Sequence, residues 1–183
     1  NNSQAINQGT NEKTIIKCQK KADKIPEEEG SFRLEYFEHL INAAYHNYQQ
    51  ILIKEYGDIY PLRSVIIKFG GFHLSYNWYG RTLLGKEEIS NLIIYTKEIH
   101  LNSLFAYSLI GLKSDIPNFK KHFGFDKLIN TIAHELAHCL LANYKLDFGR
   151  KHETEHTDLT QDITAYLLSL PEVKELEKLQ NFK

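Results

Sequence analysis

The chain has 183 residues, of which 42% are hydrophobic, and a formal net charge of −1 with a pI near 6.8. This length predicts one domain with one substantial core, and the charge balance does not favour nucleic acid as the main partner because phosphate binding requires a positive field. Only Cys18 and Cys139 are present, which excludes a disulfide scaffold and a cysteine zinc ribbon, so any metal site must use histidines and carboxylates.

No apolar run approaches the roughly 18 to 20 residues that span a bilayer, and the first thirty residues lack the hydrophobic stretch of a signal peptide. We therefore expect a soluble chain with no membrane partner. Since the sequence contains no methionine, we read it as a processed product, located in the cytoplasm or secreted after removal of an N-terminal segment. No pattern in it predicts an oligomeric state.

The chain is expected to divide into a flexible N-terminal arm, residues 1–30, and a single domain, residues 31–183. The arm is rich in Asn, Gln, Lys and Glu, a composition that buries too little apolar surface to offset the entropy of ordering. From Phe32 to Tyr56, apolar residues recur at steps of three and four, which predicts an amphipathic helix.

The middle of the chain predicts a small sheet, because short β-branched runs alternate with turn residues. The expected strands are 64–69, 71–79, 91–95 and 98–101. Residues 102–112 turn towards a helical pattern, and residues 113–125, with Pro117 and Gly124, are expected to form a loop.

A helix with a broad apolar stripe follows, and Asp126 is a suitable N-cap for it. Two further helices are expected, one over residues 158–170 and one opening at Pro171. The predicted fold is α+β: an N-terminal helix, a small mainly antiparallel sheet, the central helix and C-terminal helices.

The central helix carries the sequence His134-Glu135-Leu136-Ala137-His138. Histidines four residues apart project from one face of a helix, so both imidazoles can reach one metal ion. Glu135 lies beside them, where a carboxylate can accept a proton from an attacking water. This spacing predicts a zinc site with Glu135 as the general base.

Three segments resemble the SprT-like family of metallopeptidases, the group that includes Spartan. They are the motif segment 128–138, the preceding Lys97-Glu98-Ile99-His100-Leu101-Asn102 strand, and Gly80-Arg81-Thr82, where such proteins place a Gly-Arg turn. The resemblance covers roughly residues 32–160 and implies a zincin-like domain that cleaves a protein or peptide substrate with Zn²⁺. A weaker similarity to ImmA-type peptidases rests on the segment 162–166 and on Pro171.

The residues alone leave the third metal ligand open. His152 and His156 both follow the helix beyond Gly149, and in an extended segment both would lie on the same side of the chain. The SprT-like resemblance points to His152, whereas the ImmA-type similarity would use a carboxylate such as Asp158 or Asp162.

The sequence thus predicts a zinc-dependent endopeptidase with metal ligands His134, His138 and His152. Two alternatives are a DNA-associated SprT-like protease and a metal-stabilised interaction module that binds a partner without cutting it.

Overall fold

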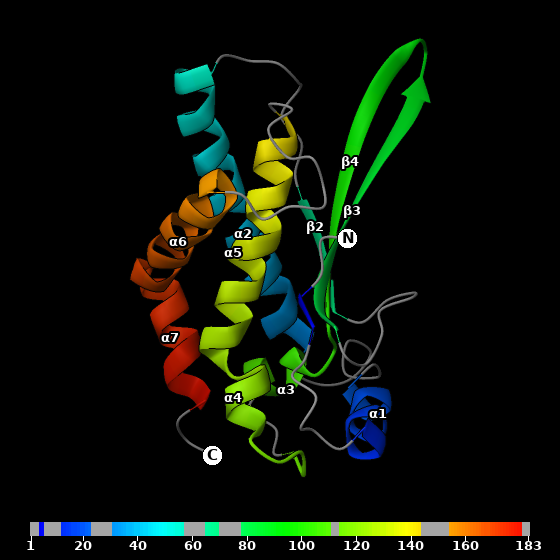
Figure 1. Cartoon of the computed structure of the whole chain (residues 1–183), viewed down its shortest axis with the longest axis vertical. Helices are drawn as coiled ribbons and strands as arrows, with labels where there is room; N and C mark the ends of the chain where they lie inside the picture. The colour runs from blue at the N-terminus through cyan, green and yellow to red at the C-terminus, as the bar shows by residue number, and fades with distance from the viewer. Residues whose placement is uncertain are drawn as a thin grey trace.

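The computed structural model describes residues 4–5, 12–22, 31–56, 65–69, 78–110, 114–143 and 154–180. They form an α+β fold, as the sequence predicts (Figure 1). In chain order the elements are β1 (Gln4–Ala5), α1 (Glu12–Ala22), α2 (Ser31–Tyr56), β2 (Val65–Phe69), β3 (Trp78–Ile89), β4 (Leu92–Leu101), α3 (Phe105–Ile110), α4 (Phe119–Phe123), α5 (Phe125–Asn143), α6 (Thr154–Ser169) and α7 (Pro171–Gln180).

The sheet has the strand order β1-β3-β4-β2. β3 pairs antiparallel with both β1 and β4, while β2 pairs parallel with β4. The prediction of a mainly antiparallel sheet is therefore confirmed. β1 is short and covers β3 only beside Trp78 and Gly80.

β3 and β4 form one long hairpin, which differs from the sequence-based prediction. The segment around Gly80 lies inside β3 instead of forming a turn, and the strands expected at 91–95 and 98–101 are one strand. The turn lies at Ser90 and Asn91, whose φ angles of 51° and 67° suit the two-residue turns that match strand twist. This hairpin is difficult to recognise in the sequence, because a polar run follows Gly85 and no Asn-Gly pair marks the turn. Residues 71–77 of the expected second strand lie outside the described part of the chain.

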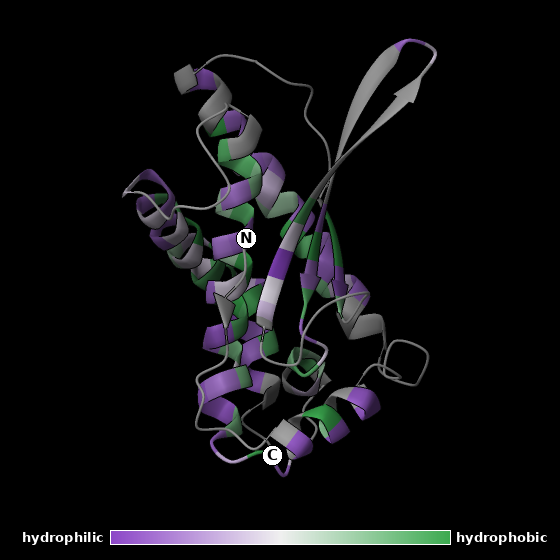
Figure 2. Ribbon diagram, turned by 45° about the vertical axis from the view of Figure 1, so that its right-hand side comes forward, coloured by the Kyte–Doolittle hydropathy of each residue, from purple (hydrophilic) through white to green (hydrophobic). Residues whose placement is uncertain are grey.

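The motif helix α5 lies at the centre of the molecule, between the sheet and α6, with α2 behind it (Figure 1). Figure 2 shows hydrophobic stretches of the helices and of the sheet meeting in the interior. The apolar stripe of α5 is wholly buried in this core, as its period predicts; its members include Leu128, Ile129, Ile132, Ala133, Leu136, Ala137 and Leu140. This packing makes α5 a rigid support for the site.

Helix α1 lies within the segment for which the sequence predicts a flexible arm. Cys18 packs against the core, and its backbone carbonyl accepts a hydrogen bond from the Tyr107 hydroxyl at 3.3 Å. Ile16 is half-buried, while Lys17 and Lys20 are exposed, so α1 has a core-facing side and a basic side. A short amphipathic helix was hidden by the polar composition of the whole segment.

Two other element boundaries differ from prediction. The expected loop over 113–125 contains α4, because Phe119 and Phe123 pack against Tyr107 and Phe105. Helix α6 begins at Thr154, four residues earlier than expected. None of the helices in the described part of the chain combines the length and hydrophobicity needed to span a bilayer.

Candidate metal centre

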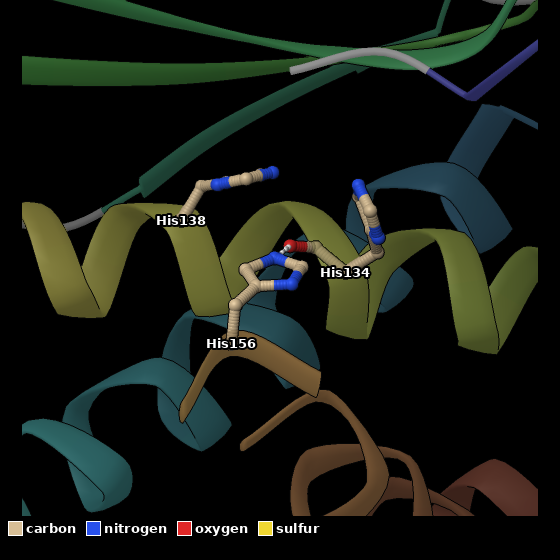
Figure 3. A group of neighbouring side chains, drawn as sticks. All are labelled: His134, His138 and His156. Carbon is tan, nitrogen blue, oxygen red and sulfur yellow. Dashed lines mark hydrogen bonds between the residues drawn. The ribbon is translucent and has the colours of Figure 1, made fainter. Parts of the chain in front are cut away.

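His134 and His138 lie on one face of α5, one turn apart, as their spacing predicts (Figure 3). Their ring centroids are 5.0 Å apart and both residues are buried. Glu135 is also fully buried. The two imidazoles and the carboxylate therefore share one enclosed part of the fold.

His156, on the first turn of α6, completes a group of three histidines (Figure 3). Its ring centroid lies 4.6 Å from that of His134 and 4.0 Å from that of His138. One nitrogen from each ring lies within 4.8 Å of the other two. The three buried histidines lie close enough to bind a metal ion.

The periodicity of α6 explains why His156 points into the fold. Its buried residues are His156, Thr160, Ile163 and Leu167, which fall on one helical face. The Thr160 hydroxyl donates to the backbone carbonyl of His156 at 2.8 Å, so this polar group is satisfied on the buried face. Two of the four residues are polar, and for that reason the stripe is hard to recognise in the sequence.

A hydrogen bond fixes the tautomer of His156. Its Nε2 lies 2.9 Å from the backbone carbonyl oxygen of His134, and because a carbonyl only accepts, Nε2 carries the proton and donates. In the neutral ring the lone pair is then on Nδ1.

The donor set fits zinc. Neutral imidazole nitrogens are common zinc ligands, with bonds of about 2.0–2.1 Å. Tetrahedral geometry at that bond length places ligand nitrogens roughly 3.3 Å apart. The ligand nitrogens of the three histidines lie within 4.8 Å of one another, so they would have to approach by up to about 1.5 Å to share one ion. Three protein ligands would leave a fourth position open.

Glu135 is held by a residue from the sheet. The hydroxyl of Thr82, on β3, donates a short hydrogen bond to Glu135 Oε2 and lies 3.4 Å from the backbone carbonyl oxygen of Glu135. Thr82 is itself buried. Thr82 was not predicted as a site residue, because the segment from Gly80 to Thr82 was interpreted as a turn. The alternating pattern of a strand that continues beyond Gly80 is the signal that could have identified it.

The structure thus brings together three of the four residues predicted for the site: His134, Glu135 and His138. The predicted third ligand, His152, lies outside the described residues, so its assignment stays a prediction. Among the described residues, His156 is the third histidine of the group. The carboxylate alternatives, Asp158 and Asp162, are exposed on α6 and do not belong to the histidine group.

Two other buried histidines make hydrogen bonds elsewhere in the fold. His100 Nε2 lies 2.8 Å from Glu98 Oε2 on the same strand, and this hydrogen bond is the main cause that lowers the pKa of Glu98. His122 Nδ1 lies 3.1 Å from the Tyr79 hydroxyl.

No family model, curated protein or solved structure matches this chain. The resemblance to SprT-like peptidases therefore remains an expectation drawn from the motif and its neighbours.

Proposed function

We propose that this chain is a zinc-dependent endopeptidase in which His134, His138 and His156 hold the metal and Glu135 is the general base. One observation carries the proposal: three buried histidines surround a single position beside the carboxylate-bearing turn of α5. Two of these histidines and the glutamate come from one helix, and the third comes from α6.

The residues of the chain have distinct roles in this reaction. When bound, zinc would supply Lewis acidity, which lowers the pKa of water towards neutrality and polarises a peptide carbonyl. Glu135 accepts the proton of the attacking water and transfers it to the leaving amine. Hydrolysis is then balanced, since the hydroxide joins the carbonyl carbon and the proton joins the nitrogen.

We place the substrate in an extended conformation along β3. This strand contacts the general base through Thr82, and β1 pairs antiparallel with it beside Trp78 and Gly80. Among the described residues β1 covers this edge only there, so the edge of β3 beyond Gly80 can offer main-chain hydrogen bonds to a substrate strand. Affinity then does not depend on one particular side chain. The proposed substrate class is therefore a protein segment that can become extended.

The replacement Glu135→Gln tests the proposed reaction. The amide is nearly isosteric but cannot accept the proton, so we expect zinc content to stay at about one per chain while kcat falls by about 10²- to 10⁴-fold. Cleavage of an unfolded protein and of a quenched-fluorescence peptide library provides the measurement. The matched control is Glu175→Gln on α7, which removes one carboxylate from an exposed position. Unchanged turnover in Glu135→Gln would contradict the proposed base.

The burial of the site favours a second candidate, a metal-stabilised interaction module. The exposed fractions of His134, Glu135, His138 and His156 are 8%, 0%, 1% and 4%, which also suits a closed structural site. Such a module would lose stability when zinc is removed but would cleave nothing. Metal-dependent unfolding together with absent cleavage in the wild type would select it over the peptidase.

A further inference from the structure

Strand β3 and helix α5 run beside each other in matching register. Gly80 lies against Thr131, and Thr82 lies against Glu135. From Gly80 to Thr82 the strand advances by two residues, about 6.6 Å, and from Thr131 to Glu135 the helix advances by four residues, about 6.0 Å. Because these two distances are similar, both contacts can form at once. The helix turn that bears Glu135 is therefore aligned with one side chain of the strand.

The close approach of these elements depends on Gly80. A Cβ atom at this position would lie 2.9 Å from Thr131 Cγ2 and 3.4 Å from the backbone carbonyl oxygen of His100. Only glycine allows the strand to lie this near the helix without displacing one of them. The hydrogen bond between Thr82 and Glu135 depends on the same approach.

Several features hold the Thr82 hydroxyl in place. Its backbone pairs opposite Ile99 in the hairpin, and its β-branched side chain has a restricted χ1 angle. Thr82 is 6% exposed and Glu135 is fully buried, so water competes little for the hydrogen bond between them. An ionised carboxylate only accepts hydrogen bonds, so Thr82 is the donor.

This hydrogen bond has a consequence for the proposed reaction. A general base is efficient only when its oxygen is held within hydrogen-bond reach of the proton that it takes. The bond to Thr82 engages Oε2 and so orients Oε1, the second oxygen, for proton transfer. We propose that Thr82 is the positioning residue of Glu135, which makes β3 part of the catalytic apparatus as well as the substrate-binding edge. This inference rests on the proposed peptidase function.

Two substitutions at one position separate the hydroxyl from the shape of the side chain. Thr82→Val keeps the branched shape and removes the donor, whereas Thr82→Ser keeps the donor. We expect Thr82→Val to lower kcat by about 10- to 100-fold with little change in KM and with full zinc content. Thr82→Ser should recover most of the lost kcat. Thr164→Val is the matched control, because the Thr164 hydroxyl donates to the backbone carbonyl of Thr160 on α6 and does not contact Glu135.

A second readout does not depend on activity. Crystal structures of the zinc-loaded variants should show the Glu135 carboxylate displaced in Thr82→Val and retained in Thr82→Ser. The inference alone is overturned if the wild type cleaves peptide and Thr82→Val keeps its kcat within about twofold, or if the serine variant is as impaired as the valine variant. A wild type that binds zinc but cleaves no peptide overturns the proposed function, and the positioning role with it.

Discussion

The imidazole of His156 donates a hydrogen bond from Nε2 to the backbone carbonyl of His134, 22 positions earlier in the chain. The bond joins the first turn of α6 to the motif turn of α5 and directs the Nδ1 lone pair away from that carbonyl. A metal ligand in proteins is commonly oriented in this way by a hydrogen bond to its other ring nitrogen. The backbone of one histidine of the group thus holds the ring of another.

We expect His156→Ala to lose zinc, because only two histidines of the described group would remain. Zinc content after metal-replete purification is the measurement, with a melting curve to show that the chain remains folded. His39→Ala is the control, since His39 is an exposed histidine on α2.

The same assay on His152→Ala tests the assignment made from the sequence. Retention of zinc there, with loss in His156→Ala, is the expected pair of results. The reverse pair would restore His152 as the third ligand.

Gly80→Ala is expected to destabilise the fold by about 1–3 kcal/mol, because its Cβ atom would overlap with Thr131 at the contact between β3 and α5. The free energy of unfolding from denaturant titration measures the effect. Thr131→Ser removes the methyl group involved and should recover part of the loss in the double variant. Equal effects of Gly80→Ala in the two backgrounds would show that the contact with Thr131 is not the cause.

His122 predicts a pH dependence of stability. Burial, followed by the charges of Lys121 and Lys127, lowers the pKa of His122 in the folded chain; the Tyr79 hydroxyl also faces it, and burial raises the pKa of that group. Between the lowered pKa and about pH 6.5, the ordinary histidine pKa, the unfolded chain therefore binds more protons at His122 than the folded chain does. The stability contributed by neutral His122 is complete above that value and is lost as the pH falls through the lowered pKa.

The unfolding free energies of the metal-free wild type and of metal-free His122→Gln, measured between pH 7.5 and 5, check this sign. The two proteins share every other ionisable group, so the difference between them isolates His122. The wild type should lose more stability than the variant on acidification. A difference that is constant with pH would refute the prediction.

DNA binding is expected to be weak, with a dissociation constant on the order of 10⁻⁴ M or weaker at physiological salt, because the net charge is only −1. Fluorescence anisotropy at two salt concentrations gives both the affinity and the number of phosphate contacts. Tight binding with a steep salt slope would instead favour the DNA-associated alternative. Replacing the exposed Lys17, Lys20 and Lys21 of α1 by glutamate would then show whether this basic side is responsible.

The sequence by itself determined what depends on local periodicity. The 3.6-residue repeat placed His134 and His138 on one face of a buried helix, with Glu135 beside them, and the same repeat predicted α2 and α5. These features are determined by residues that are close together in the sequence, so they can be predicted without knowledge of the fold.

Only the tertiary structure decided which distant residues join the motif. Thr82 is 53 positions from Glu135, and His156 reaches the site because α6 starts at Thr154 and packs on α5. Single polar residues at such separations carry no periodic pattern, and the packing of strand and helix selects them. Glu135 thus contacts the sheet because Gly80 lets β3 lie against the motif helix, a contact set by the close packing of two elements.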